Sequence, residues 1–341
     1  MTSLFAFAIG IAGPRTPSDA RSGTATDALD FFFPAPLLHP PEALAEAATD
    51  LVEGVQEITP ATAAALNQNT GLALAPAAML SGDQPLIAVK LAADTPIQSG
   101  AEAYLKLHLL SHRLCLPNSL NLANIFAHLP NVAWTSDGPI RVEELADWQL
   151  KARLEGRGLE VFAVDKFPKM VNYVVPAGVR IADASRIRLG AYLGDGTTVM
   201  HEGFVNFNAG TVGPNMVEGR VSQGVVLGAG TDLGGSASTM GTLSGGGSLI
   251  ISIGQNCLIG ANAGTGIPLG DRCTIEAGLY ITAGTKVSVR DETGAEVSQI
   301  KARELAGQND MLFIRDSSNG QVICRTNRKA IELNDALHSH N

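Results

Sequence analysis

The sequence predicts a mainly β protein: a left-handed parallel β-helix, preceded by an N-terminal α/β domain and followed by a small C-terminal α+β extension. Three observations predict this fold. From Val175 onward the chain repeats every six residues, and nearly every hexapeptide opens with Val, Ile or Leu. The 341 residues include 37 glycines but only 5% aromatic residues, whereas a conventional core depends on Phe, Tyr and Trp. Residues 1–160 show instead the mixed helix and strand patterns of an α/β region.

The six-residue period is seen in VPAGVR, IADASR, IRLGAY and LGDGTT. It matches neither the 3.6-residue period of a helix nor the two-residue period of a strand. In a left-handed parallel β-helix each hexapeptide forms one flat side of a triangular coil, with the aliphatic residue inside and a small residue at the corner. Glycine suits such corners, which explains its abundance, and Cys257 and Cys273 fall where a small buried side chain is wanted. We expect about six coils of about 18 residues between Val175 and Val287.

Two interruptions break the period, at residues 211–220 and 239–252, and the register slips by two residues at TGIP. Both interruptions are rich in polar residues and glycine, which the stacking of coils does not require. Because functional residues concentrate in loops that a rigid scaffold positions, the interruptions are where we expect the site.

Three domains are predicted: an N-terminal domain, residues 1–160; the β-helix, residues 171–289; and a C-terminal extension, residues 290–341. The apolar opening SLFAFAIGIAG lacks the basic segment and cleavage site of a signal peptide, so we expect a buried first strand. The other elements expected before the repeat are helices at residues 40–54, 101–114 (amphipathic) and 141–156, and a strand at residues 85–93.

The C-terminal extension is expected to hold a hairpin or loop at residues 290–299 and a helical turn at residues 301–307. Two strands within residues 311–326 are joined through Asn319 and Gly320, a pair typical of a type I′ turn. The last residues, 328–341, are expected to form a helix that caps the open end of the β-helix.

Charge and cysteine content limit the classes of partner. The formal net charge of −9 argues against nucleic acid and against an anionic membrane surface, since both need clustered positive charge. Four cysteines show neither CxxC nor Cys/His spacing, so we expect reduced, buried thiols rather than a zinc or redox site. No stretch approaches the roughly 20 apolar residues of a membrane helix. A cytoplasmic protein is expected.

The most informative charged motif is Glu218-Gly219-Arg220, inside the first interruption. Residues two apart in an extended segment point to the same side, so Arg220 would hold Glu218 ionised. A carboxylate kept ionised in this way can act as a base or as a nucleophile. The alternative is an ordinary surface ion pair, which contributes little.

Longer stretches resemble one family. DKFPKMVNYVVPAGVRIADASRIRLGAYLGDGTTVMHEGFVNFNAGT, MVEGRVSQGV, STMGTLSGGG and ISIGQNCLIGANAGTGIPLGD are similar to the tetrahydrodipicolinate N-succinyltransferases, in the long form found in actinobacteria and pseudomonads. The resemblance implies transfer of the succinyl group of succinyl-CoA to tetrahydrodipicolinate, whose cyclic imine hydrates and opens. The product would be N-succinyl-2-amino-6-oxopimelate, in diaminopimelate and lysine biosynthesis. It also implies a homotrimer with active sites between neighbouring β-helices.

The resemblance assigns roles to residues of this chain. It implies that Glu218 is catalytic and forms an acyl-anhydride, although from the residues alone a general base for direct attack stays open. On electrostatic grounds Lys301 and Arg303 are candidates for the 3′-phosphate of CoA. Backbone amides of STMGTLSGGG are candidates for stabilising an oxyanion, unless this is only a loop. The implied succinyl-CoA contacts are Arg220, Gly235, Ser238, Ala261, Glu276, Ala277, Gly284, Lys301, Ile314, Arg315, Asp316 and Ser317.

A metal is implied only weakly. The family places Mg²⁺ near the trimer axis on a glutamate that corresponds to Glu202 and on an aspartate, but Ser185 stands at the aspartate's position. Mg²⁺ prefers several carboxylate oxygens, so this departure puts the site in doubt unless three symmetry copies of Glu202 suffice. His108 and His112 have the i, i+4 spacing of a metal pair, but without an HExxH motif we expect a structural pair.

Three other functions occur among proteins with a hexapeptide β-helix. A γ-class carbonic anhydrase needs three zinc-binding histidines in the β-helix, and His201 is the only histidine between residues 175 and 287. A different hexapeptide acyltransferase, using acetyl-CoA and His201 as base, stays open. A non-catalytic β-helix scaffold is the third alternative, and the polar interruptions of the repeat argue against it.

Overall fold

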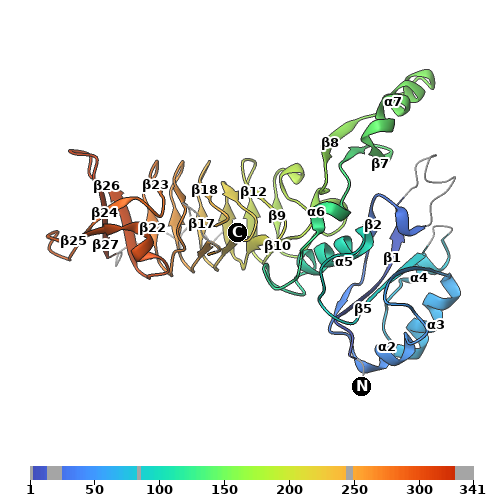
Figure 1. The fold of residues 1–341 in the computed structure, drawn as a ribbon. Helices are drawn as coiled ribbons and strands as arrows, with labels where there is room; N and C mark the ends of the chain where they lie inside the picture. The colour runs from blue at the N-terminus through green and yellow to red at the C-terminus, as the bar shows by residue number, and fades with distance from the viewer. Residues whose placement is uncertain (1–2, 14–24, 83–85, 243–248, 327–341) are drawn as a thin grey trace. The chain divides into compact units, whose positions relative to one another are not determined.

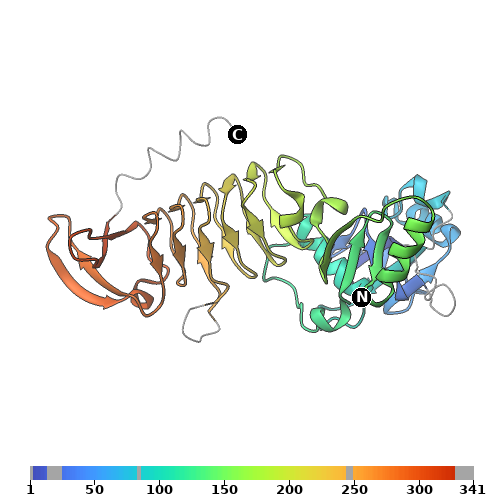
Figure 2. The ribbon, with the colours of Figure 1, turned by 90° about the horizontal axis from the view of Figure 1, so that it is seen from above.

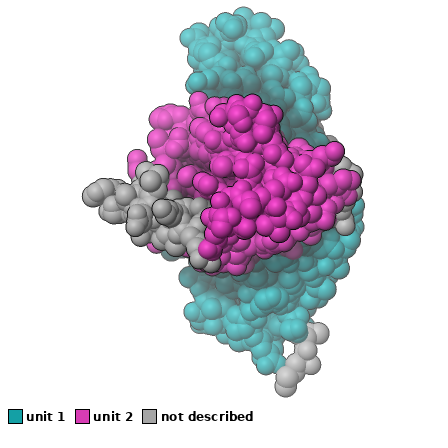
Figure 3. All heavy atoms as spheres, turned by 90° about the vertical axis from the view of Figure 1, so that its left-hand side faces the viewer, with its two compact units in different colours: residues 1–115, 119–168 teal, residues 116–118, 169–341 magenta. Residues whose placement is uncertain are grey.

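The computed structural model describes residues 3–13, 25–82, 86–242 and 249–326. The chain divides into two compact units, which Figure 3 shows in two colours. Unit 1 comprises residues 1–115 and 119–168, and unit 2 comprises residues 116–118 and 169–341. Unit 2 therefore holds both the repeat region and the C-terminal segment.

Unit 1 contains an antiparallel sheet in the order β2-β1-β5-β4, with β3 also paired to β1. The predicted opening strand is β1, which is buried along nearly its whole length. No helix within the described ranges is long and apolar enough to cross a membrane. The elements are β1 (Ala6–Ala12), η1 (Ala25–Asp27), β2 (Phe31–Phe32), β3 (Leu37–Leu38), α2 (Glu42–Ala47), β4 (Gly54–Ile58), α3 (Pro60–Thr70), α4 (Ala77–Leu80), β5 (Leu86–Leu91), α5 (Gly100–Ser111) and α6 (Ile125–His128).

Helix α5 is confirmed, but its predicted amphipathic character is wrong. Every residue of α5 from Ala101 to Ser111 is buried. The charged residue Lys106 is fully buried because its Nζ donates to Asp94 Oδ1 at 2.6 Å and to the carbonyls of Thr95 and Asn121, each at 2.7 Å. An ammonium group with three hydrogen-bond acceptors can be buried without an unsatisfied donor. The lysine in this helix therefore does not indicate a solvent-exposed face.

A second antiparallel sheet of unit 1 has the order β7-β6-β8 and is followed along the chain by unit 2. The predicted helix at residues 141–156 is confirmed as η2 and α7, which lie near β7 and β8 (Figure 1). The elements are β6 (Val132–Thr135), β7 (Gly138–Arg141), η2 (Val142–Glu144), α7 (Leu145–Leu154) and β8 (Val161–Asp165).

Unit 2 is a left-handed parallel β-helix, as predicted, whose rungs stack in a ladder (Figure 2). Three sheets form its faces. Face 1 contains β9, β11, β14, β17, β20 and β22; face 2 contains β12, β15, β18, β21 and β23; face 3 contains β10, β13, β16 and β19. The chain visits faces 1, 2 and 3 in turn, so edge 1–2 and edge 2–3 are the corners that follow faces 1 and 2.

The bounds of the β-helix elements are η3 (Met170–Asn172), β9 (Arg180–Ile181), η4 (Ala184–Arg186), β10 (Ala191–Leu193), β11 (Thr197–Val199), β12 (Phe204–Val205), β13 (Ala209–Thr211), β14 (Asn215–Val217), β15 (Arg220–Val221), β16 (Val226–Leu227), β17 (Asp232–Leu233), β18 (Ser238–Thr239), β19 (Ser252–Ile253), β20 (Leu258–Ile259), β21 (Gly264–Thr265), β22 (Thr274–Ile275) and β23 (Tyr280–Ile281).

The interior follows the hexapeptide pattern. On face 1, Val217, Leu233, Ile259 and Ile275 are completely buried, and they open successive hexapeptides or stand in their register. Cys257, Cys273 and Cys324 are also buried, and all four cysteines are free thiols, as expected, although Cys115 is only half-buried. Corner residues adopt the left-handed backbone conformation that closes each turn, and they are Asn208, Ser236, Asn256, Asn262 and Arg272.

The coil length varies, which corrects the uniform 18-residue prediction. Thr198 pairs with Met216, a step of 18 residues, but Phe204 pairs with Arg220, a step of 16, and Asp232 pairs with Leu258, a step of 26. The long coil contains the glycine-rich insertion, of which residues 243–248 lie outside the described part.

The predicted break over residues 211–220 was too wide. Thr211 and Val217 are both fully buried, so the register continues through them and changes only at Glu218 and Gly219. The prediction failed because Thr211 is a polar inward residue. Its hydroxyl is satisfied inside the coil by the hydroxyl of Thr197, at 2.8 Å.

The C-terminal segment extends face 1, since β26 pairs in parallel with β22. The predicted hairpin, helical turn and two strands are present as β24 (Lys286–Arg290), β25 (Glu296–Lys301), η5 (Ala302–Leu305), β26 (Met311–Arg315) and β27 (Val322–Thr326). The predicted type I′ turn is wrong: residues 316–321 connect β26 to β27, and Gly320 has a positive φ but Asn319 does not. The predicted capping helix at residues 328–341 lies outside the described residues.

Candidate active site

Glu218 lies at edge 1–2. Val217 ends β14 on face 1 and Arg220 begins β15 on face 2, so Glu218 and Gly219 form the corner between them. The prediction that Glu218 and Arg220 share one extended segment and one side is therefore wrong, because the chain turns between the two residues. Glu218 is half-buried, and its Oε2 lies 3.8 Å from the position of a Cβ built on Gly235, in the next coil.

Glu218 and Arg220 form no ion pair in the part of the chain that the structure describes. Arg220 Nη2 instead donates to Ser238 Oγ at 2.6 Å, one strand further along face 2. An ordinary surface ion pair therefore does not explain the motif. The two charges are held separately, which leaves both available to ligands.

A groove of about 540 Å³ runs beside this corner. Two guanidinium groups line it, those of Arg186 and Arg220, with Glu202 as the carboxylate among its lining residues. Ser236 Oγ donates to Glu202 Oε2 at 2.9 Å, so this carboxylate already has a partner. The other lining residues are Phe204, Gly219, Ala237 and Ser238.

Edge 1–2 collects a row of predicted site residues from successive coils. Glu218, Gly235, Ala261 and Glu276 each follow a strand of face 1, and strands of one face are stacked about 4.8 Å apart. The row thus extends about 14 Å from Glu218 to Glu276. Glu276 Oε2 accepts from the backbone N–H of Arg315 at 2.7 Å, which adds the loop of residues 315–317 to the end of the row.

A second group of predicted residues lies at edge 2–3. Gly284 follows β23 of face 2, and the turn after Lys301 is tied to this edge by hydrogen bonds from Ala302 N to Thr285 O at 2.8 Å and from Arg303 N to Ala283 O at 3.2 Å. The glycine-rich insertion also leaves the coil here, after β18. Within one chain, the width of face 2 separates Glu218 from Gly284 and from the turn after Lys301. Residues 243–248 of the insertion lie outside the described part, so the predicted oxyanion amides stay a prediction.

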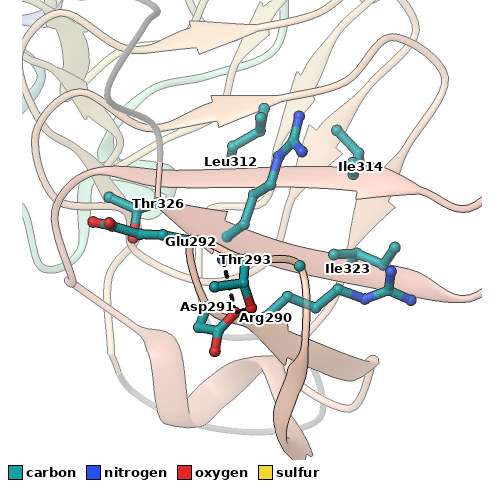
Figure 4. Close-up of a pocket in the computed structure, with 10 residues that line it drawn as sticks. Arg290, Asp291, Glu292, Thr293, Leu312, Ile314, Ile323 and Thr326 are labelled. Atoms are coloured by element: carbon teal, nitrogen blue, oxygen red, sulfur yellow. Dashed lines mark hydrogen bonds between the residues drawn. The ribbon is translucent and has the colours of Figure 1, made fainter.

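The C-terminal segment contains a further pocket, of about 560 Å³. Its apolar part consists of Leu312 and Ile314 on β26 and Ile323 on β27, and the loop that contains Asp291 and Thr293 lies across from them (Figure 4). The other lining residues are Arg290, Glu292, Gly294, Arg325 and Thr326.

Asp316 lies close to this pocket, in the loop after β26. Its Oδ2 is 3.8 Å from Nη2 of Arg290, which lines the pocket. Hydrogen bonds from Ser318 hold the pKa of Asp316 below its usual range. The pocket therefore adjoins the end of the edge 1–2 row, where Ile314 is a predicted CoA contact.

The residues of one chain do not fit a magnesium site. The carboxylate of Glu202 already accepts a hydrogen bond from Ser236 through Oε2. At the other expected ligand position Ser185 has no carboxylate, and its hydroxyl donates to Asp183 Oδ1 at 2.6 Å. Among the described residues, no group of three or more His, Cys, Asp and Glu is placed to hold a metal ion. One carboxylate falls short of the oxygen set that Mg²⁺ requires.

The histidines have separate roles. His108 is buried in α5, where Nε2 accepts from Phe33 N at 3.3 Å and Nδ1 pairs with Tyr104 O at 2.8 Å, so both ring nitrogens serve the fold. Burial lowers the pKa of His108 to about 3, which keeps the ring neutral. His201 is exposed near edge 1–2 but is not among the residues that line the groove.

Comparisons with known proteins agree with this architecture. A family model described as "Hexapeptide repeat of succinyl-transferase" matches residues 250–283, and one described as "Tetrahydrodipicolinate N-succinyltransferase middle" matches residues 129–169. A 2,3,4,5-tetrahydropyridine-2,6-dicarboxylate N-succinyltransferase from Pseudomonas aeruginosa is 57% identical and covers 99% of both chains. The chain belongs to the tetrahydrodipicolinate N-succinyltransferase family.

Two further members of the tetrahydrodipicolinate N-succinyltransferase family support the assignment. The Vibrio cholerae enzyme of the same name is 54% identical, over 98% of this chain and 99% of its own length. A crystal structure from Campylobacter jejuni, described as a candidate 2,3,4,5-tetrahydropyridine-2-carboxylate N-succinyltransferase, is 31% identical with a TM-score of 0.84 and covers 97% of this chain and 94% of its own.

Sequence reasoning missed five of the residues that line the groove, and they are Arg186, Phe204, Gly219, Ser236 and Ala237. The pairing Phe204 with Arg220 and Arg220 with Ser238, together with the bridge from Ile187 to Val205, places Arg186, Phe204, Arg220 and Ser238 in one column on face 2. Their spacings of 18, 16 and 18 residues would have revealed this column, had the two-residue shortening at Glu218 been located.

Proposed function

We propose that the protein transfers the succinyl group of succinyl-CoA to tetrahydrodipicolinate, giving N-succinyl-2-amino-6-oxopimelate and CoA, a step of diaminopimelate and lysine biosynthesis. The row of residues along edge 1–2 carries this proposal. It begins at a half-buried carboxylate, Glu218, and continues over the open corners at Gly235 and Ala261 to the loop at Arg315. Such a row fits an elongated thioester whose reactive end lies at Glu218. The family membership supports the reaction class.

In this proposal Glu218 is the general base that accepts the proton of the attacking amine. The amine nitrogen of the ring-opened acceptor attacks the thioester carbonyl carbon, the new N–C bond forms, and the C–S bond breaks as the CoA thiolate leaves. Glu218 accepts the proton that the nitrogen loses and returns it to the thiolate sulfur. In the acyl-anhydride alternative the same carboxylate attacks the carbonyl first, the C–S bond breaks and the CoA thiolate leaves. The amine then attacks the anhydride, the C–O bond to Glu218 breaks, and the nitrogen's proton passes to the thiolate. Both routes need a carboxylate that no other side chain engages.

Arg220 is assigned to the succinyl end of the donor. Its guanidinium lies on face 2 next to the corner of Glu218 and is held by Ser238. The terminal carboxylate is what distinguishes a succinyl group from an acetyl group, and a guanidinium is well suited to bind it. The rest of the donor would extend over Gly235, Ala261, Glu276 and Ala277 toward Ile314 to Ser317.

A homotrimer is part of the proposal. Gly284 and Lys301 lie at edge 2–3, away from Glu218 within one chain, so a donor that contacts both groups would lie between edge 1–2 of one copy and edge 2–3 of its neighbour. Lys301 and Arg303 would then face the 3′-phosphate of CoA. A cytoplasmic location is also proposed, because four free thiols fit a reducing compartment.

A donor assay tests the function. Purified protein is incubated with tetrahydrodipicolinate and either succinyl-CoA or acetyl-CoA, and the release of CoA thiol is followed. We expect turnover with succinyl-CoA and a much lower kcat/KM with acetyl-CoA. Equal kcat/KM values would overturn the assignment of Arg220 to the succinyl carboxylate, and no turnover with either donor would overturn the proposed reaction.

A further inference from the structure

The pocket in the C-terminal segment of unit 2 combines an apolar floor with charged groups of both signs. Its volume is about 560 Å³. The apolar floor consists of Leu312 and Ile314 on β26 and Ile323 on β27, and the loop that contains Asp291 and Thr293 lies across from it (Figure 4). The proposed reaction uses none of the charged residues that line this pocket.

The strand register places two arginines of the pocket side by side. Val289 on β24 pairs with Cys324 on β27 in a parallel ladder, so the next residues of the two strands, Arg290 and Arg325, lie at neighbouring positions on one side of the sheet. Both arginines line the pocket. Like charges at neighbouring positions of a sheet repel each other. The pair therefore favours an anion between the two guanidinium groups.

The described residues leave both guanidinium groups incompletely matched. Nε of Arg290 is buried and has no hydrogen-bond partner among them. Nη2 of Arg290 lies 3.8 Å from Asp316 Oδ2, which is too long for a hydrogen bond. Arg325 forms no ion pair within the described ranges. A ligand that supplies an acceptor to the buried Nε is favoured, because a buried donor without an acceptor is destabilising.

Negative charge lies in the turn between β24 and β25. Asp291 and Glu292 line the pocket there. Asp291 Oδ1 accepts from the backbone N–H groups of Thr293 at 2.9 Å and Ala295 at 3.0 Å, which fixes the shape of the turn. With two arginines and two carboxylates, the lining is neutral overall. It is complementary to a ligand that carries one charge of each sign.

We propose that this pocket binds an aliphatic α-amino acid as a regulatory ligand. The carboxylate of the ligand lies between Arg290 and Arg325, its ammonium group faces the turn of Asp291 and Glu292, and its side chain packs on the apolar floor. A concave site of this size, with an apolar surface and a few convergent polar groups, is typical of small-molecule sites. The end product of the proposed pathway, lysine, is one source of such a ligand, and the general amino-acid pool is another.

Arg290 links the pocket to the donor end of the active site. The same guanidinium lies near Asp316, in the loop of residues 315–317 that the donor is proposed to contact. A ligand carboxylate that draws Arg290 toward Arg325 removes the positive charge from beside Asp316 and changes the position of this loop. We therefore expect the amino acid to weaken the binding of succinyl-CoA. This link rests on the proposed function, whereas binding in the pocket does not.

Calorimetry on the full chain tests the pocket without turnover. L-Norleucine and hexanoate differ only in the α-ammonium group, and we expect L-norleucine to bind about 10- to 100-fold tighter, the range for hydrogen bonds to a charged group. Arg290→Gln and Arg325→Gln should each weaken the binding of L-norleucine by about the same factor. Arg180→Gln, which changes an exposed arginine on face 1, should bind like wild type. Tighter binding of L-lysine than of L-norleucine would assign the pocket to the end product, and equal binding to amino acids in general.

Kinetics separates the possible failures. With saturating L-norleucine we expect KM for succinyl-CoA to rise about tenfold and then level off, with no rise in Arg325→Gln. Equal binding of L-norleucine and hexanoate would overturn the site, and so would L-norleucine binding that survives both substitutions. A KM that rises without levelling off would show direct competition and give the pocket to the donor, and an unchanged KM would refute the link to the loop. Arginine-dependent binding in a protein that turns over no donor would support the pocket while the proposed reaction fails.

Discussion

Two corners of the β-helix are each two residues shorter than the repeat requires, and they differ in almost every other respect. At edge 1–2, inward Val217 is followed by inward Val221, and at edge 2–3, inward Thr265 is followed by inward Leu269. The first corner presents the half-buried Glu218, next to an exposed arginine. In the second, residues 263–269 are all buried.

The buried corner uses its polar groups for itself. Thr265 Oγ1 donates to Ile267 O at 2.7 Å and accepts from Ile267 N at 3.2 Å, and Pro268 O accepts from Gly307 N at 3.0 Å. At the other corner the structure gives Glu218 no hydrogen bond to its carboxylate from any described residue. The shortened corner at residues 265–269 therefore serves packing, whereas the shortened corner at Glu218 presents a carboxylate without a hydrogen-bond partner among the described residues. A break in the six-residue period alone does not identify a functional site.

The largest contrast is expected from Glu218→Gln. The substitution keeps the size of the side chain but removes the base, and loss of a general base or nucleophile costs about 10²- to 10⁴-fold in rate. We expect kcat to fall by about this factor while Tm stays within about 1 °C, because no hydrogen bond of the carboxylate is lost. Thiol release and differential scanning calorimetry give the two values. An unchanged kcat would show that the carboxylate has no chemical role.

Thr265→Val should show the opposite pattern. The substitution leaves the N–H and C=O of Ile267 unsatisfied inside the coil, which costs about 1–3 kcal/mol. The expected result is a Tm lower by several degrees, at about 2–4 °C per kcal/mol for a unit of this size, with kcat of the folded protein unchanged. If Thr265→Val lowered kcat and left Tm intact, the buried corner would belong to the site and the contrast between the corners would be lost.

The six-residue period predicted the β-helix because the stacking of coils requires an inward aliphatic residue at every sixth position. Such a repeat can be seen in a single sequence. It could not locate the shortened corner, since Thr211 occupies an inward position with a hydroxyl that Thr197 satisfies. The sequence predicts Glu218 as a site residue, and this stays a prediction, whereas it gives no signal for the groove residue Arg186. Arg186 becomes a neighbour of Glu202 only through the folded corner, where its guanidinium meets two carbonyl groups that carry no sequence signal.

The smallest expected effect concerns the surface between Glu218 and the donor. A Cβ at Gly235 would make only an ordinary contact, 3.8 Å from Glu218 Oε2, and the backbone there needs no positive φ. Gly235→Val should therefore fold normally but occupy the surface that the donor is proposed to cover, at a cost of about 1–2 kcal/mol. We expect KM for succinyl-CoA to rise about tenfold, with KM for tetrahydrodipicolinate unchanged. Gly158→Val, at an open position in unit 1, is the matched control and should leave both KM values unchanged. A rise in KM for the acceptor alone would reverse the proposed direction of the groove, because the donor would then enter from the coils before Glu218.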